Sequence, residues 1–378
     1  MSNKYLFLLL ISCYTLLTSG QNKTLLFVGT YTEGKVDNGI YIFEFNTSKG
    51  KLKLTGSGEN LINPSFLTIA PNGQYLYACM ESKLPQKGSV AAFKIDSLKG
   101  KISFINKQSS EGENPVYLTV DPSNRFIINA NYNAGNIAVF KTNVDGSIQP
   151  AVQIFNFSGS SVIKSRQEQS HIHAAIFSPT YDYVYCTDLG ADKIRTFKFD
   201  STQANPLQPI ENLDIKTSLG SGPRHMTFHP NQHYAYCIEE LNGMITAYSY
   251  SNGKLEAVQS IFSYSKKQED YGGADIHISP DGKFLYASNR LNNENTISIF
   301  SINDKNGRLT LVGHQKTFGD HPRNFIIDPS GKFLIVANLA TNNLVVFKRN
   351  LMTGLLTKTK QEIKIPRPSC LQMRAYHF

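Results

Sequence analysis

One stretch, GPRHMTFHP at residues 222–230, decides the fold because related versions of it return along the chain. It alternates polar and apolar side chains, which is typical of a β-strand, and its closing proline begins a tight turn. Other copies are NPSFLTIAP at 63–71, NPVYLTVDP at 114–122 and HPRNFIIDP at 321–329, and two copies without the first proline end at Pro179 and Pro280. The pattern predicts a strand, a turn and a returning strand in each copy.

The returning strands and a third strand also repeat. The returning strands are LLFVG at 25–29, YLYAC at 75–79, FIINA at 126–130, YVYCT at 183–187, YAYCI at 234–238, FLYAS at 284–288 and FLIVA at 333–337. A third strand ends on an aromatic residue seven times, at Phe43, Phe93, Phe140, Phe197, Tyr248, Phe300 and Phe347. A fourth strand, such as GKLEAV at 253–258, fills the rest of each repeat. The sequence thus contains seven repeats rich in β-forming residues.

The spacing of the repeats identifies the architecture. The six prolines that close the first strand, Pro71, Pro122, Pro179, Pro230, Pro280 and Pro329, are separated by 51, 57, 51, 50 and 49 residues. This is somewhat more than the roughly 40 to 45 residues of a minimal four-stranded propeller blade. We therefore predict an all-β chain that forms a seven-bladed β-propeller with four antiparallel strands per blade.

The two ends of the chain complete one repeat. The first repeat begins at its second strand, at Leu25, whereas the segment 368–373 near the C-terminus matches the first strand at 64–69 and nothing follows it. Pairing of these terminal segments in one blade closes the ring and removes the open sheet edges. We predict that residues 21–378 form a single propeller domain.

Residues 1–20 are predicted to be a signal peptide. Lys4 precedes an apolar run from Tyr5 to Leu17, and Thr18-Ser19-Gly20 offers the small residues of a cleavage site. The run is too short to favour a membrane span. Export to the periplasm or the medium is the expectation, with lipoprotein processing at Cys13 as a weaker alternative.

Composition excludes several classes of function. The net charge is +9, but the lysines lie in turn-like segments without an arginine-rich helix or aromatic platform, so nucleic-acid binding is not expected. Cys79, Cys186, Cys237 and Cys370 show no disulfide framework and no CxxC metal spacing, and buried free thiols are expected. No nucleophile elbow, phosphate-binding loop or HExxH motif is present.

Ionisable side chains are predicted to gather at one end of the central channel. The first strand starts, and the second strand ends, on the same face of a propeller. Six residues before the closing proline the blades carry Ser65, Val116, His173, Arg224, Ala274, Arg323 and Ser369. Nine and ten residues after it they carry Thr30-Tyr31, Met80-Glu81, Asn131-Tyr132, Asp188-Leu189, Glu239-Glu240, Asn289-Arg290 and Asn338-Leu339.

Several motifs together resemble the seven-bladed lactonase family of propellers. They are VGTYT at 28–32, ANYNAG at 130–135, HIHAAIFSP at 171–179, TDLGAD at 187–192, GPRHMTFHP at 222–230 with EEL at 239–241, and SPDGKFLYASNR at 279–290. The resemblance covers residues 24–376. The family contains propeller-type 6-phosphogluconolactonases and 3-carboxy-cis,cis-muconate lactonizing enzymes, so the resemblance implies lactone ring opening or its reverse without a metal or organic cofactor.

The resemblance also implies a catalytic set. A histidine, two arginines and a glutamate of the family match His173, Arg224, Arg290 and Glu240. Either Glu240 or a neutral His173 could activate water, and the arginines could stabilise an oxyanion or hold a phosphate or carboxylate. The additional substrate contacts predicted around these four residues are Arg323, Glu239, Tyr132, Asn131, Tyr31 and Asp188.

A purely structural role is the alternative for several of these residues. Glu240 and Arg224 could form a structural ion pair, and Asp188 and Asn131 could cap strand ends. His225 and His229 are predicted to be structural because neither occupies the repeat position that opens on the channel.

The leading functional hypothesis is an exported hydrolase of a sugar lactone, acting as a monomer or weak dimer on a small molecule. The alternatives are a non-catalytic propeller that binds a carbohydrate or a protein through the same face, and a muconate-type cyclase.

Overall fold

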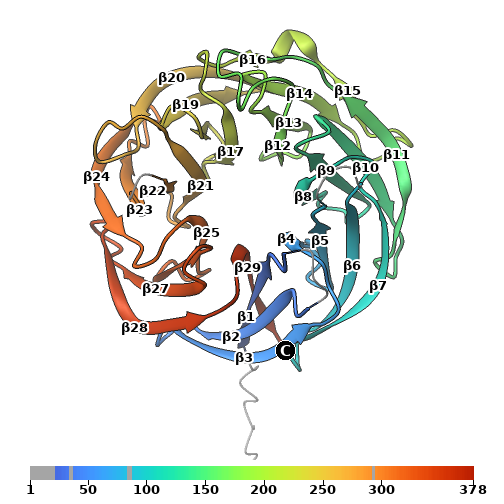
Figure 1. Ribbon diagram of the computed structural model, residues 1–378, viewed down its shortest axis with the longest axis vertical. Helices are drawn as coiled ribbons and strands as arrows, with labels where there is room; N and C mark the ends of the chain where they lie inside the picture. The colour runs from blue at the N-terminus through green and yellow to red at the C-terminus, as the bar shows by residue number, and fades with distance from the viewer. Residues whose placement is uncertain (1–21, 34–36, 83–86, 292–293) are drawn as a thin grey trace, which may run out of the picture.

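The protein is a closed ring of seven antiparallel sheets (Figure 1). The computed structural model describes residues 22–33, 37–82, 87–291 and 294–378. The predicted signal peptide and Cys13 lie outside these residues. Within the described residues, no helix has the length and the apolar character needed to cross a membrane.

Each blade runs from an inner strand near the propeller axis to an outer strand at the rim. Blade 1 consists of β29 (Pro368–His377), β1 (Asn22–Thr30), β2 (Ile40–Asn46) and β3 (Lys51–Gly58). Blade 2 consists of β4 (Pro64–Ile69), β5 (Tyr75–Met80), β6 (Ser89–Asp96) and β7 (Lys101–Ser109). Blade 3 consists of β8 (Pro115–Val120), β9 (Phe126–Asn131), β10 (Asn136–Thr142) and β11 (Ile148–Asn156).

The remaining blades continue the series around the ring. Blade 4 consists of β12 (Ile172–Phe177), β13 (Tyr183–Asp188), β14 (Lys193–Phe199), β15 (Leu207–Pro209) and β16 (Ile215–Lys216), with the 3-10 helix η1 (Glu211–Leu213) between the last two. Blade 5 consists of β17 (Pro223–Phe228), β18 (Tyr234–Glu239), β19 (Met244–Ser251) and β20 (Lys254–Phe262). Blade 6 consists of β21 (Gly272–Ile278), β22 (Phe284–Arg290), β23 (Thr296–Ile302) and β24 (Leu309–Lys316). Blade 7 consists of β25 (Pro322–Ile327), β26 (Phe333–Asn338), β27 (Asn343–Arg349) and β28 (Leu356–Lys364).

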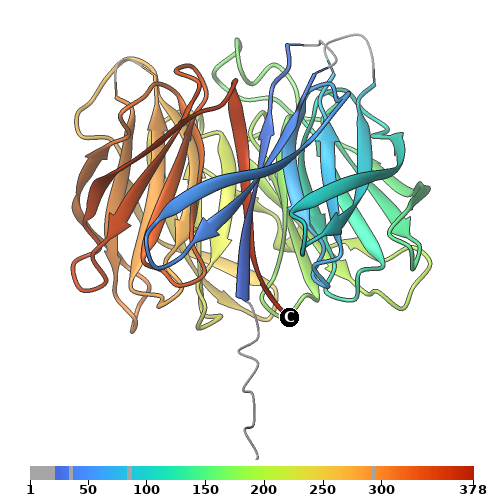
Figure 2. The same cartoon turned by 90° about the horizontal axis from the view of Figure 1, so that it is seen from below.

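The predicted ring closure is confirmed. β29, from the C-terminus, pairs antiparallel with β1 along its whole length, from Asn22 opposite His377 to Thr30 opposite Pro368. Figure 2 shows the two strands side by side, with the C-terminus at the lower face. The end of β1 lies toward the opposite, upper face, because it pairs with the start of β29. The upper face is the one at which second strands end, and the lower face carries the turns that follow the first strands.

Blade 4 departs from the predicted four strands because its outer strand is split. β15 pairs with one end of β14 and β16 with the other, and at Thr196 between them the ladder is replaced by other hydrogen bonds. The backbone N–H of Thr196 donates to the carboxylate of Asp214 at 2.8 Å, and its hydroxyl donates to the carbonyl of Leu213. Pro209 ends β15, since a proline has no N–H to donate to a continuing ladder.

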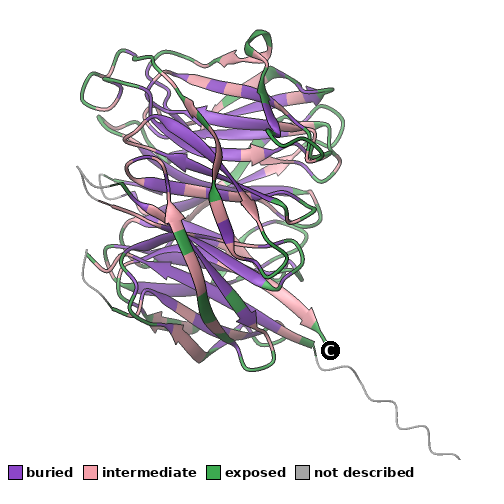
Figure 3. Cartoon of the chain, turned by 90° about the vertical axis from the view of Figure 1, so that its right-hand side faces the viewer, coloured by how far each residue is buried: buried purple, intermediate pink, exposed green. Residues whose placement is uncertain are grey.

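The hydrophobic core is divided among the spaces between blades. The described residues form seven apolar clusters, one between each adjacent pair of blades. The second strands contribute to two clusters each: in β18, Tyr236 and Ile238 face blade 6, whereas Ala235 and Cys237 face blade 4. This two-sided burial explains why the second strands are continuous apolar runs. Figure 3 shows burial along the blade interiors and exposure at the turns.

The four cysteines of the described residues are buried free thiols, as predicted. Cys79, Cys186 and Cys237 lie on second strands and pack within the clusters, and Cys370 lies on β29.

Candidate active site

Each first strand carries a β-bulge at the position predicted to open on the channel. The register of the pairing with the second strand shifts by one residue there in all seven blades. The bulge residues are Ser65, Val116, His173, Arg224, Ala274, Arg323 and Ser369. A bulge places an extra residue in one strand and re-aims its side chain. Six of these residues, including His173, Arg224 and Arg323, line an enclosed cavity of about 10 Å³ on the propeller axis, room for about one water molecule.

The ends of the second strands divide the predicted residues into two groups. Side chains alternate along a strand, so neighbouring residues face opposite directions. Tyr31, Tyr132, Glu240 and Arg290, ten residues after the closing proline position, lie within the arginine cluster or against it.

Three predicted substrate contacts point into their own blades instead. The residues nine positions after the proline, Asn131, Asp188 and Glu239, are buried. Asn131 binds the carbonyl of Ser110, Asp188 forms an ion pair with Arg195, and Glu239 accepts from Thr246. These side chains therefore bond within the protein, as the capping alternative predicts for Asn131 and Asp188, and their predicted contact with substrate stays a prediction.

Glu240 is the centre of the cluster. Its Oε2 atom lies 2.9 Å from Nε of Arg224 and 3.2 Å from Nη2 of Arg290, and its Oε1 atom lies 2.6 Å from Nη2 of Arg166. Three guanidinium groups from three different parts of the chain therefore meet on one carboxylate. The group carries a net positive charge.

The charges of this cluster set its protonation. Burial raises the pKa of Glu240, but Arg290, Arg224 and Arg166 outweigh burial and hold this pKa far below the usual range of a glutamate. Burial and the neighbouring Arg290 lower the pKa of Arg224 to about 9, so this guanidinium remains protonated at neutral pH. A carboxylate with so low a pKa is a poor proton acceptor near neutral pH.

His173 is buried beside the arginines and stays neutral. Burial, followed by the charges of Arg224, His225 and Arg323, holds its pKa well below that of a free histidine. Its Nδ1 atom is buried and makes no hydrogen bond with any residue that the structure describes. The ring lies edge-on to Tyr132, with centroids 5.5 Å apart. His173 thus offers an unused ring nitrogen next to the positive cluster.

Arg290 and Arg323 flank the cluster differently. Nε of Arg290 donates to the carbonyl of Gly272 at 3.0 Å and its Nη1 to the ring of His321 at 3.2 Å, so Arg290 is held firmly. Arg323 lies over the ring of Tyr31 at 5.4 Å and makes no hydrogen bond or ion pair with the described residues. Arg323 is therefore the arginine available to an incoming anion.

Arg166 was missed by the sequence analysis. It lies in the segment 157–171 between β11 and β12, contacts Glu240 and the hydroxyl of Tyr132, and its side chain is 39% exposed. Buried Asp192 anchors this segment, since it accepts hydrogen bonds from Ser161, Gln167 and the backbone N–H of Gly222. The long 57-residue spacing between Pro122 and Pro179 was the available signal.

His225 is also placed differently from the prediction. It faces the axis directly below His173, with ring centroids 5.2 Å apart, because the bulge turns two successive residues inward. His229 matches its predicted structural role: its ring binds the carbonyl of Gly282 in the next blade at 2.8 Å.

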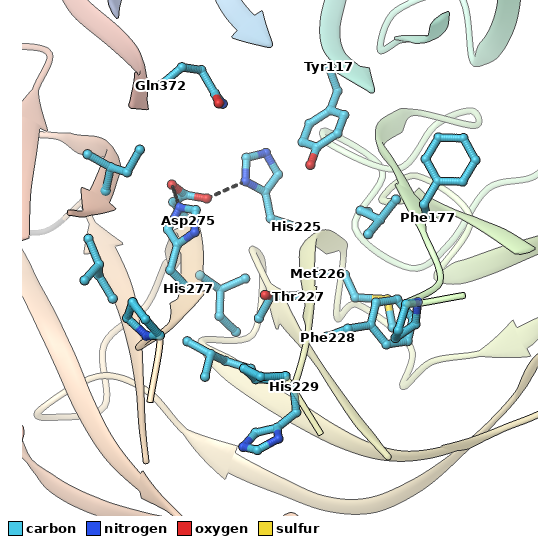
Figure 4. A pocket seen from close by; sticks show the side chains of 18 of the residues that line it. Tyr117, Phe177, His225, Met226, Thr227, Phe228, His229, Asp275, His277 and Gln372 are labelled. Atoms are coloured by element: carbon cyan, nitrogen blue, oxygen red, sulfur yellow. Dashed lines mark hydrogen bonds and ion pairs between the residues drawn. The ribbon is translucent and has the colours of Figure 1, made fainter. Parts of the chain in front are cut away.

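A larger pocket of about 550 Å³ opens on the lower face, away from the arginine cluster (Figure 4). Among the residues that the structure describes, no group of three or more His, Cys, Asp or Glu side chains could hold a metal ion.

The fold and this cluster define a class: a seven-bladed propeller with a histidine, a glutamate and several arginines at one end of its axis. Comparison with known proteins is consistent with this class. The model of the family described as "Lactonase, 7-bladed beta-propeller" matches residues 25–373. A 6-phosphogluconolactonase of Formosa agariphila is 47% identical over 93% of this chain and 99% of its own length, and one of Bacillus subtilis is 35% identical over 92% and 97%.

A solved structure extends the comparison. The periplasmic gluconolactonase of Pseudomonas aeruginosa superimposes with a TM-score of 0.87 at 31% identity, over 93% of this chain and 99% of that one. The chain belongs to the seven-bladed β-propeller lactonase family.

Proposed function

We propose that the protein hydrolyses a sugar lactone at the cluster around Glu240. Family membership and the relatives described as 6-phosphogluconolactonases support this reaction class. The observation that carries the proposal is a neutral histidine, His173, with an unused ring nitrogen beside the guanidinium groups of Arg224 and Arg323. A base next to fixed positive charge is what ester hydrolysis by water requires.

In the proposed reaction, a water molecule attacks the carbonyl carbon of the lactone while Nδ1 of His173 takes one of its protons. The carbonyl oxygen becomes an oxyanion, which the guanidinium groups of Arg224 and Arg290 stabilise. The bond between the carbonyl carbon and the ring oxygen then breaks. The proton passes from His173 to the departing ring oxygen, and the open hydroxy acid releases its carboxyl proton to solvent and leaves as a carboxylate.

Glu240 has a supporting role in this scheme. Both of its oxygens are occupied by arginines and its pKa is strongly lowered by them, so it orients the guanidinium groups and does not carry the proton. Of the two candidate bases that the sequence offered, His173 is the one with a free acceptor.

We further propose that the protein is exported and that its natural substrate is a sugar lactone found outside the cytoplasm. The apolar run before Gly20 and the similarity to a protein described as a periplasmic gluconolactonase support export. The excess of arginines favours lactones that carry a negative group.

Arg323→Met tests the substrate. We expect the mutant to lose roughly 10- to 150-fold in kcat/KM for 6-phosphogluconolactone, equivalent to one charge-assisted hydrogen bond of about 1.5–3 kcal/mol. Its rate with unphosphorylated gluconolactone should stay close to wild type. Initial rates of the purified wild type and mutant on both lactones give the answer. Saturable binding without turnover in the wild type would favour a non-catalytic binding protein instead.

Arg166→Ala tests the contact that the sequence did not reveal. We expect KM to rise about tenfold while kcat changes little, because Arg166 lies at the exposed edge of the cluster and Glu240 keeps its two buried partners. Lys164→Ala, which removes an exposed positive charge from the same segment, is the matched control. Equal KM values for the two mutants would remove Arg166 from the substrate site.

A further inference from the structure

A second layer of side chains lies below the bulge residues and separates the arginine cluster from the lower pocket. Phe66, His225 and Asn324 each directly follow a bulge residue, and each lines both the small axial cavity and the lower pocket of about 550 Å³. The ring of Tyr117 packs on Phe66 at 4.4 Å and on His225 at 5.4 Å. The layer is thus a packed wall across the axis, and the buried ring of His225 borders the cavities on both sides of it.

Asp275 is the polar centre of this wall. It is buried, and its Oδ1 atom lies 2.8 Å from Nδ1 of His225. Its Oδ2 atom lies 2.9 Å from Nε2 of His277 and accepts hydrogen bonds from the amide of Asn324 and the backbone N–H of Phe325. Burial raises the pKa of Asp275, but His277 and His225 outweigh burial and hold it well below the usual range. The carboxylate therefore remains ionised and acts as an acceptor only.

An ionised Asp275 determines the tautomer of His225. Since the carboxylate accepts, Nδ1 of His225 must carry the proton (Figure 4). Burial and the charge of Arg224 lower the pKa of His225 to about 4, so the ring is neutral at pH 7 and its Nε2 atom presents a lone pair. That atom lies 3.2 Å from Nη1 of Arg224. The contact is favourable in this tautomer only, because Arg224 has no acceptor.

The contact with His225 completes the restraint on Arg224. Its Nε atom is held by Glu240, and its Nη1 atom by the carbonyl of Ala274 and by His225. Among the described residues, nothing accepts a hydrogen bond from Nη2. Nε and Nη1 of the guanidinium are therefore held by the protein, and Nη2 can donate to a ligand.

We propose that Asp275 and His225 act together as positioning residues for Arg224: Asp275 fixes the proton on Nδ1 of His225, and Nε2 of His225 holds the guanidinium in the orientation that contacts substrate. The substrate contact rests on the function proposed above, whereas the restraint on Arg224 does not. Packing alone does not require these groups, since blades 2 and 3 fill the same layer with Phe66 and Tyr117. A buried carboxylate is costly to retain without partners, and one partner of Asp275, His225, borders the axial cavity.

The first arm of the test is spectroscopic and needs no turnover. Two-bond ¹H–¹⁵N spectra of the full chain should show His225 of the wild type as the Nδ1–H tautomer, the one in which Nε2 can accept from Arg224. The guanidinium ¹⁵N signals of Arg224, assigned by their loss in Arg224→Lys, should be separate in the wild type and averaged by rotation in His225→Phe. A wild-type His225 that carries its proton on Nε2, or separate signals in His225→Phe, overturns the proposal.

The second arm measures gluconolactone and 6-phosphogluconolactone hydrolysis. His225→Phe and Asp275→Asn should lose roughly tenfold to a hundredfold in kcat with a small change in KM, as is common when a group that orients a site residue is removed. His225→Gln, whose amide oxygen can accept from Arg224, should recover most of the rate. His229→Gln, at a lower-pocket residue whose ring binds the carbonyl of Gly282 instead of Asp275, should stay within about twofold.

The two arms separate the two proposals. Full wild-type kcat in a folded His225→Phe protein, with a melting temperature like that of His225→Gln, overturns the positioning role. A wild type that turns over neither lactone, with the spectroscopic results as expected, rejects the proposed function and leaves the restraint on Arg224 standing.

Discussion

His173→Asn is expected to lower kcat for lactone hydrolysis roughly 10²- to 10⁴-fold, the range that a positioned general base contributes. KM should change little, because the arginines that hold the substrate are untouched. The fold should also persist, since Nδ1 of His173 makes no hydrogen bond within the described part of the chain. Steady-state rates and a melting curve on the same preparation test both statements.

Ser65→Ala is the matched control for this mutant. Ser65 is the bulge residue of blade 2 and lines the same axial cavity as His173, and its hydroxyl also lacks a hydrogen-bond partner among the described residues. We expect its kcat to remain within about twofold of wild type. If His173→Asn kept more than a tenth of the wild-type kcat, the base would have to be sought elsewhere in the cluster.

The pH profile gives a further check on His173. Its pKa is lowered in the folded protein, so the neutral, proton-accepting form persists to pH values below the 6.5 of a free histidine. The acid limb of kcat/KM reports this ionisation in the free enzyme and should lie below pH 6.5. A limb at or above that value would contradict the assignment.

The propeller could be predicted because its determinants are local and repeated. A strand ending two residues before a proline turn, such as the one before Pro230, depends on alternation and turn chemistry within ten residues. The split outer strand of blade 4 could not be predicted, because it depends on hydrogen bonds from Thr196 to Asp214 and Leu213. The other repeats contain no counterpart of these bonds in their sequence pattern. Local rules fix the blades, and irregular connections follow from packing.

The candidate site was predicted less completely, for reasons that the bulges explain. Repeat alignment located His173 and Arg224 because the bulge occurs at the same position in every blade. It could not show that the bulge also turns the next residue, His225, inward. It placed Glu239 beside Glu240 in the site, although strand alternation sends the two side chains in opposite directions. Arg166 reaches Glu240 from a segment with no counterpart in other blades, so periodicity carried no information about it.

Glu240→Gln is expected to destabilise the protein by about 3–5 kcal/mol at pH 7, the usual cost of breaking a buried ion pair by removing one partner. The mutation leaves Arg224 and Arg290 buried side by side without a counter-charge. Urea unfolding monitored by tyrosine fluorescence measures the difference. Activity should fall as well, because the arginines lose the group that orients them. A loss of less than about 1 kcal/mol would mean that the arginines do not depend on this carboxylate for their stability.

The neighbouring Glu239 provides a control, because its pKa is shifted in the opposite direction to that of Glu240. Its partners, Thr246 and Asn242, are neutral, and burial raises its pKa. Glu239→Gln should therefore change stability by about 1 kcal/mol or less at pH 7.

The contributions of Glu240 and Glu239 to the free energy of unfolding should also change with pH in opposite directions. The folded pKa of Glu240 lies below its unfolded value, so its stabilisation is fully present above about pH 4.3 and is lost as the pH falls toward the folded pKa.

The folded pKa of Glu239 lies above its unfolded value, so its contribution favours folding in acid and is lost as the pH rises through the folded pKa. Unfolding free energies between pH 3 and pH 7 should thus rise less steeply with pH in Glu240→Gln than in wild type, and more steeply in Glu239→Gln. Parallel curves for all three proteins would show that neither carboxylate has the environment described above.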